Sequence, residues 1–167
     1  MDQFGEERAI PFIQYNEGKF SINPEAEEFV KQIPAPMGVI AVAGLYRTGK
    51  SYLLNRIILN QQSGFGVGPT INACTKGLWI WKKPISGMTA DGNPINILVI
   101  DSEGLGALDE DSNHDIKIFS MALLLSSFFI YNSVGSIDES ALQNLNLVIN
   151  LTKHIQLKAL SKNENRS

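Results

Sequence analysis

A glycine-rich segment, Gly44–Ser51, has the residue types that hold a nucleoside triphosphate. It reads GLYRTGKS, which matches the phosphate-loop pattern G-x-x-x-x-G-K-[ST]. Glycines let the backbone curl so that its N–H groups point at phosphate oxygens. Lys50 then reaches the β- and γ-phosphates, and the Ser51 hydroxyl is placed to ligate magnesium. The segment therefore predicts a site for a nucleoside triphosphate with Mg²⁺.

Two motifs further along the chain complete this chemistry. The apolar run Ile97–Ile100 ends in Asp101, whose carboxylate is expected beside the phosphate loop, holding the water shell of the magnesium ion. Gly104 follows three residues later and completes Asp-x-x-Gly, a spacing that brings its N–H to the γ-phosphate. Thr75 is expected to offer its hydroxyl to the same ion, with a solvated loop threonine as the alternative. The three motifs in this order favour a GTPase-type switch over an ATPase.

Arg47 is an unusual residue inside a phosphate loop, because its position faces the bridge between the β- and γ-phosphates. A guanidinium there would neutralise the charge that develops as the terminal phosphate leaves. This is an arginine finger supplied from within the chain. The alternative interpretation, a solvent-exposed arginine without a catalytic role, stays open from the sequence.

Alternating strand and helix patterns predict how these motifs are positioned. The apolar run Val39–Ala43 leads into the glycines and reads as a buried strand, and Lys50–Leu59 follows as a helix. Further expected elements are strands at Gly77–Trp81, Ile95–Ile100 and Ser127–Tyr131, a buried helix ending near Leu125, and loops over 61–76, around Asp91–Pro94 and over 102–114. This alternation predicts an α/β fold of the P-loop NTPase type, a mostly parallel sheet flanked by helices.

The two ends of the chain carry further local signals. Residues 11–23 read as two short strands around the turn Asn16–Gly18, and Asn23 caps a helix that starts with Pro24. Two prolines, Pro34 and Pro36, end that helix. Ser136 and Glu139 have the capping-box spacing and predict a last helix, followed by a polar tail.

Composition limits the class of protein. Hydrophobic residues make up 44% and charged residues 19% of 167 residues, with a net charge of −3, so the chain reads as an ordinary globular domain without a basic footprint for nucleic acid. One cysteine, Cys74, and the lack of a signal peptide predict a cytoplasmic protein. The uncharged run 118–134 contains several serines and reads as a buried helix and strand, so no transmembrane segment is expected.

Taken together, the motifs resemble the guanylate-binding protein family of dynamin-related large GTPases. The resemblance rests on the phosphate loop with its flanks (42–55), on Thr75–Trp79, on Asp101–Gly106 and on the run LSSFFIYNS at 125–133. It covers about residue 12 to residue 156, and the form GLYRTGKS is highly specific to that family. Atlastin-like GTPases share the architecture but less of this wording.

The resemblance implies Mg²⁺-dependent hydrolysis of GTP to GDP, in some members onward to GMP, and a nucleotide-dependent homodimer through the GTP-binding face. It implies catalytic roles for Arg47, Thr75 and Glu103, the last in the network near the attacking water. It implies metal ligation by Ser51, Thr75 and Asp101. The residues expected to bind the nucleotide are Gly44, Tyr46, Arg47, Thr48, Gly49, Lys50, Ser51, Tyr52, Thr75, Asp101 and Gly104.

Two departures from the family pattern qualify this hypothesis. Some members place a serine, thought to orient the attacking water, two residues before the switch threonine, and here that position is Ala73. The base-reading motif, Thr-Leu-Arg-Asp or similar, is expected on a later strand that residues 1–167 do not contain, nor do they contain a helical C-terminal region. The chain is therefore expected to be the N-terminal part of a GTPase domain, incomplete at its C-terminal side.

Three interpretations remain open at this stage. The chain is a GTPase, or a nucleotide-dependent assembly module that hydrolyses slowly, or an incomplete fragment without activity of its own. The phosphate and magnesium residues favour the first, Ala73 motivates the second, and the missing base-reading strand motivates the third.

Overall fold

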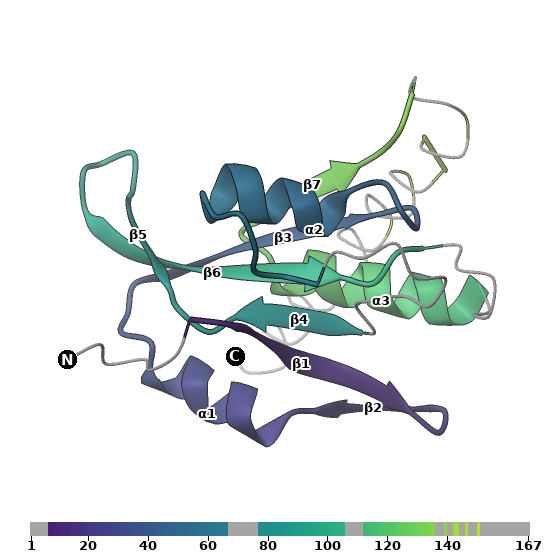
Figure 1. The fold of residues 1–167 in the computed structure, drawn as a ribbon, viewed down its shortest axis with the longest axis horizontal. Coiled ribbons are helices and arrows are strands. Elements are labelled where there is room, and N and C mark those ends of the chain that lie inside the picture. The colour runs from purple at the N-terminus through teal and green to yellow at the C-terminus, as the bar shows by residue number, and fades with distance from the viewer. Residues whose placement is uncertain are drawn as a thin grey trace, which may run out of the picture. The chain divides into compact units, whose positions relative to one another are not determined.

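The computed structural model describes residues 7–66, 77–105 and 112–135, together with Glu139, Leu142, Gln143, Asn146 and Asn150. The chain divides into two compact units, Met1–Asn132 and Ser133–Ser167. The strands and helices named below belong to the first unit (Figure 1). They are β1 (Ala9–Asn16), β2 (Lys19–Ile22), α1 (Pro24–Gln32), β3 (Met37–Gly44), α2 (Lys50–Leu53), the π-helix η1 (Leu54–Ile58), β4 (Leu78–Trp81), β5 (Ile85–Met88), β6 (Pro94–Ser102), α3 (Ser112–Leu125) and β7 (Phe128–Asn132).

One sheet organises the first unit, in the order β2-β1-β4-β6-β3-β7, with β5 paired to β6. β3 runs parallel to both of its neighbours, β6 and β7. The remaining pairings, toward the N-terminal hairpin and β5, are antiparallel. Parallel neighbours need a long crossover such as a helix, whereas antiparallel neighbours are joined by short turns. The predicted α/β class is confirmed, and the sheet is mixed, with its parallel part around the strand that carries the phosphate loop.

Helices cover both faces of this parallel part. On one face, α2 and η1 pack against a core of Val42, Leu54, Phe65, Trp81 and Val99. α3 lies on the other face, behind β4 and β6 in the view of Figure 1. Its side chains Ile118, Phe119 and Ala122 are buried. Because successive side chains of a strand point to opposite faces of the sheet, the residues next to Val42 in β3 and next to Val99 in β6 point toward the face that α3 covers.

The predicted helix and strand in the run 118–134 are confirmed as α3 and β7. α3 ends at Leu125, as expected, and β7 is shifted by one residue from the predicted range. No helix within the described part of the chain is long and apolar enough to cross a bilayer. In the second unit, Glu139, Leu142, Gln143, Asn146 and Asn150 are helical, in agreement with the predicted last helix, while Ser136 lies outside the described residues.

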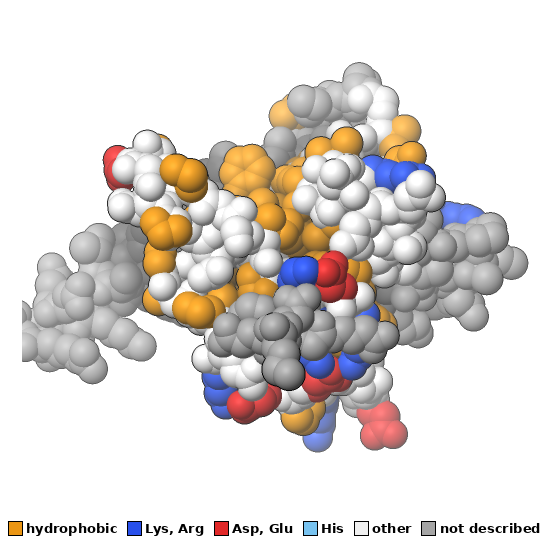
Figure 2. Space-filling view, turned by 60° about the vertical axis from the view of Figure 1, so that its left-hand side comes forward, with side chains coloured by type: hydrophobic (Ala, Val, Ile, Leu, Met, Phe, Trp, Pro, Cys, Tyr) orange, Lys and Arg blue, Asp and Glu red, His pale blue; other side chains and the backbone are white. Residues whose placement is uncertain are grey.

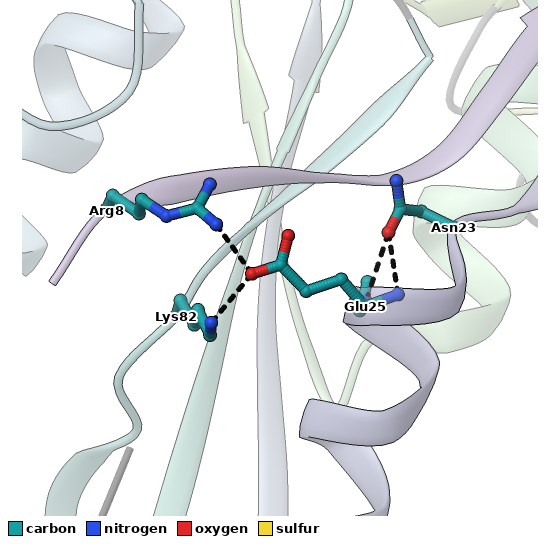
Figure 3. A network of polar contacts seen from close by, with 5 residues as sticks. Arg8, Asn23, Glu25 and Lys82 are labelled. Carbon is teal, nitrogen blue, oxygen red and sulfur yellow. Dashed lines mark hydrogen bonds and ion pairs between the residues drawn. The ribbon is translucent and has the colours of Figure 1, made fainter. Parts of the chain in front are cut away.

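The N-terminal segments are tied to the sheet by capping and ion pairs. The Asn23 side chain accepts hydrogen bonds from the backbone N–H groups of Glu25 (2.9 Å) and Ala26 (3.2 Å), so the predicted N-cap is confirmed. The Glu25 carboxylate contacts Arg8 at 2.6 Å and Lys82 at 2.7 Å (Figure 3). Figure 2 likewise shows acidic and basic side chains lying next to one another. These charges connect α1 to the segments flanking β1 and β4.

Two local predictions were wrong. The whole connection between the strands expected at Gly77–Trp81 and Ile95–Ile100 was expected as a loop, but Ile85–Met88 forms β5, and the Asp91-Gly92 turn joins it to β6. A Cβ at Gly87 would lie 2.7 Å from Cδ1 of Ile97, so a larger residue there would have to displace the end of that side chain. The helix expected over 50–59 is α-helical only to Leu53. It then widens into η1, where the N–H of Leu59 donates to the carbonyl of Leu54 at 2.8 Å.

Candidate nucleotide-binding site

The phosphate loop follows β3 directly, and its backbone requires the two glycines of the pattern. A Cβ on Gly44 would lie 2.0 Å from the carbonyl oxygen of Asn132, so only glycine fits between β3 and β7. Gly49 has φ +85° at the N-cap of α2, in the left-handed region that glycine adopts without strain. Arg47 also has a positive φ, +58°. For a non-glycine residue this conformation costs roughly 1–2 kcal/mol, a strain that proteins retain mainly at functional sites.

Internal hydrogen bonds give the loop its shape. The carbonyl oxygen of Leu45 accepts from the Thr48 hydroxyl and from the Lys50 ammonium, both at 2.9 Å. From the end of β7, the Asn132 amide donates to the Thr48 carbonyl at 2.8 Å and to its hydroxyl at 3.0 Å. Sequence reasoning assigned no role to Asn132. Its signals in the sequence were its place next to an apolar strand and its inclusion in the run LSSFFIYNS, on which the family resemblance rests.

The predicted magnesium residues Ser51 and Asp101 lie together. Because β3 and β6 are parallel neighbours, with Val42 opposite Asp101, the carboxyl end of β6 lies beside the phosphate loop. The Ser51 hydroxyl donates to Oδ2 of Asp101 at 2.5 Å, and Asp101 is fully buried. Magnesium in nucleotide sites takes one or two protein oxygens besides phosphate oxygens and water. This pair fits such an ion, and the described residues contain no larger cluster of metal-ligating side chains.

Lys50 is buried, with 6% of its surface exposed. Burial lowers the pKa of its ammonium, while the negative charges of Asp101 and Glu103 act in the opposite direction. The two acids therefore help to keep a cation inside the site, where a phosphate group would supply a further negative partner.

The Asp-x-x-Gly segment lies against the phosphate loop. The Leu105 N–H donates to the Gly44 carbonyl at 3.0 Å, and the Tyr46 N–H donates to the Leu105 carbonyl at 2.8 Å. A Cβ on Gly104 would lie 2.4 Å from Cα of Tyr46. Glycine is therefore required at Gly104 for this close approach to the loop, and its contact with the γ-phosphate remains a prediction.

Glu103 lies in the interior, with 6% of its surface exposed. Its carboxylate accepts the N–H of Gly77 and contacts Nε2 of His114, and its own N–H donates to the Gly77 carbonyl at 2.9 Å. Sequence reasoning did not find His114. The predicted network at the attacking water remains a prediction.

The other predicted residues are less enclosed. Tyr52 is 57% exposed, Arg47 is exposed, and the Arg47 guanidinium carbon lies 5.8 Å from the centre of the Tyr46 ring. Thr75 and Ala73 lie outside the described residues. Beside the loop is an open hollow of about 490 Å³, with both polar and apolar walls. It is lined by Thr48, Gly49, Tyr52, Leu53, Arg56, Ile57 and Asn132.

Comparison with known proteins supplies an independent line of evidence. Residues 17–167 match the family model described as guanylate-binding protein, N-terminal domain. The chain is 42% identical to human guanylate-binding protein 1 over 157 residues, which cover 93% of this chain and 25% of that protein. It is 41% identical to human guanylate-binding protein 2 over 149 residues, covering 88% and 24%. The chain thus spans about a quarter of the length of these relatives.

Proposed function

The chain belongs to the guanylate-binding protein family, and from this premise we propose that it binds GTP with magnesium and hydrolyses it to GDP, as part of a GTPase domain. The observation that carries the proposal is the hydrogen bond between Ser51 and Asp101 beside the phosphate loop. The glycines of this loop cannot be replaced without a steric clash or backbone strain. A hydroxyl and a carboxylate in this position hold the metal ion that accompanies a bound triphosphate.

Each group of the loop has a defined task in this function. Backbone N–H groups of the loop and the Lys50 ammonium bind phosphate oxygens, and the Asn132 amide keeps the loop in shape. Ser51 and Asp101 would hold the magnesium ion. When bound, that ion supplies positive charge that offsets the charge on the β- and γ-phosphates. Thr75 is proposed as a further ligand from the segment before β4.

Arg47 is proposed to stabilise the charge that builds up as the γ-phosphate leaves. Its strained backbone and exposed side chain place the guanidinium in the loop but leave it able to reorient toward a ligand. Glu103 is proposed to act near the attacking water from its buried position. In the same proposal two chains associate through the GTP-binding face in the reducing cytoplasm.

Nucleotide titration of the 167-residue chain tests the binding part. A fluorescently labelled GTP should bind in the presence of Mg²⁺ and be displaced by GTP more readily than by ATP. Ser51→Ala should weaken Mg²⁺-dependent binding, whereas Ser21→Ala, an exposed serine on β2, should leave it unchanged. Equal binding by the Ser51 and Ser21 variants would contradict the assigned site. Absence of GTP binding would show that residues 1–167 lack a working site.

A second candidate function is a nucleotide-dependent assembly module with slow hydrolysis. Ala73 favours it, because alanine has no hydroxyl to orient the attacking water. Molecular mass and phosphate release measured on the same samples separate the two candidates. Assembly with GTP but negligible phosphate release would favour the module, and rapid release would favour the GTPase.

A further inference from the structure

A buried histidine at the start of α3 is enclosed by two aromatic rings. His114 is 3% exposed, and its ring centre lies 4.4 Å from that of Tyr15 and 5.6 Å from that of Phe20. The planes of His114 and Phe20 differ by only 12°, so these two rings are stacked. Tyr15 and Phe20 are opposite each other in the β1–β2 hairpin. The hairpin therefore fixes the plane of the imidazole ring.

The orientation of this ring directs Nε2 at the Glu103 carboxylate. Opposite an ionised carboxylate, the tautomer with its proton on Nε2 donates to Oε1, while the Gly77 N–H donates to Oε2. A carboxylate removed from water needs such donors, because an unsatisfied buried charge is costly. Glu103 thus receives one donor from α3 and one from the residue just before β4.

Gly77 lies close to the backbone of β1. Its φ is +74°, and a Cβ would lie 2.0 Å from the carbonyl oxygen of Ile13 in β1. The Gly77 backbone therefore approaches β1 so closely that no side chain would fit at this position. His114, Glu103 and Gly77 together form a buried chain of hydrogen bonds between α3 and the start of β4.

This chain of hydrogen bonds ends at the nucleotide site. Glu103 lies between Asp101, which bonds Ser51, and Gly104, which lies against the phosphate loop at Tyr46. The negative charge of Glu103 also acts on Lys50. A rotation of the Glu103 side chain would therefore change the distance of its negative charge from Lys50. It would also change the backbone position of the neighbouring Gly104.

We propose that His114 is a positioning residue of the nucleotide site: it holds the Glu103 carboxylate on Gly77 and thereby sets the geometry of the Asp-x-x-Gly segment during hydrolysis. The inference deepens the proposed GTPase function and rests on it. The competing interpretation is that His114 only packs in the core. A packing role and a positioning role differ in which variants restore activity.

The test uses four forms of the chain: wild type, His114→Ala, His114→Gln and Phe20→Leu. Gln presents an amide N–H to the carboxylate but lacks the ring, whereas Phe20→Leu removes a stacked ring and keeps the donor. GTP affinity, kcat and KM are measured on each, together with amide hydrogen exchange at Gly77. Folding of each variant is checked by circular dichroism.

We expect His114→Ala to lower kcat by about 10- to 100-fold, the range measured for partners that orient ligands in metal sites, with GTP affinity within about twofold. Gly77 should exchange faster in this variant. His114→Gln should recover most of both losses, and Phe20→Leu, which keeps the donor but loosens the ring, should lower kcat less than His114→Ala does. If His114→Ala does not fold, a His114→Gln variant with Gly77 protection and kcat near wild type supports the proposal.

Other outcomes overturn it. Wild-type kcat or wild-type Gly77 exchange in His114→Ala would show that the histidine does not position Glu103. Loss of activity in His114→Gln and Phe20→Leu alike would assign His114 to packing only. A wild-type chain that binds GTP but releases no phosphate would refute hydrolysis itself, and the inference with it, so this result is distinct from failure of the inference alone.

Discussion

Removing the Asn55 side chain should destabilise the protein more than any ordinary surface change. Asn55 lies in η1, behind the phosphate loop, and is 3% exposed. Its amide donates to the Phe65 carbonyl at 3.0 Å and accepts the Phe65 N–H at 2.8 Å. Phe65 is 2% exposed and its ring lies 5.8 Å from that of Trp81. Asn55 therefore anchors the segment that leaves the helix toward Thr75.

The size of the effect follows from these two bonds. A net hydrogen bond contributes about 1 kcal/mol, and each buried backbone group left without a partner costs about 1–3 kcal/mol. Asn55→Ala leaves both the N–H and the carbonyl of Phe65 without a partner, so we expect a loss of about 2–6 kcal/mol in the free energy of unfolding. The free energy of unfolding of a typical domain is about 5–15 kcal/mol, so this loss should leave the variant only marginally folded.

Urea denaturation followed by tryptophan fluorescence measures this loss, because Trp81 is in contact with the anchored segment. Asn93→Ala is the matched control, since Asn93 is exposed in the β5–β6 turn and its change should fall within about 0.5 kcal/mol. A loss below about 1 kcal/mol in Asn55→Ala would show that water replaces the amide, and that the segment is not anchored by this residue.

Three further changes test the phosphate loop. Arg47→Ala should leave GTP affinity within about twofold and slow turnover by about 10³-fold or more, as for other arginine fingers, and unchanged turnover would exclude that role. Lys50→Met should abolish GTP binding but raise the thermal midpoint of the nucleotide-free protein. Burial lowers the pKa of Lys50 in the folded state, so the unfolded chain binds more protons between the two pKa values. Wild-type stability should therefore gain with rising pH as Lys50 titrates, and Lys50→Met should lack this gain. Gly44→Ala should prevent folding of the loop because its Cβ would meet the Asn132 carbonyl, whereas Gly92→Ala, with open space around it, should cost only the roughly 1–2 kcal/mol of its left-handed backbone.

Local patterns were enough to predict the elements that carry the phosphate site. The run before Gly44 had to be a buried strand, because only a strand delivers the loop to the carboxyl edge of a parallel sheet. The same reasoning placed Asp101 beside Ser51, and the structure shows their bond. Both predictions concern residues whose partners follow from the order of parallel strands.

Residues whose role depends on distant partners could not be found in this way. The strand β5 carries only a weak alternation, and its place depends on the turn at Gly92 and on its pairing with β6, where Ile85 lies opposite Ile97. Asn132 and His114 are single polar residues next to apolar runs, a pattern with many meanings. Their roles became visible only when β7 was placed beside the loop and the β1–β2 hairpin beside α3.

Several unfavourable features of the described structure lie in the phosphate loop and the segments beside it. Arg47 has a left-handed backbone, Lys50 and Asp101 are buried charges, and the site is closed by a carboxylate, Glu103, held away from water. Each of these lowers the stability of a nucleotide-free chain, and none is needed for the sheet, whose core is apolar. Strain and buried charge at a binding site can be retained when a ligand offsets them. The chain should therefore gain more stability from Mg²⁺-GTP than from any substitution that keeps the site.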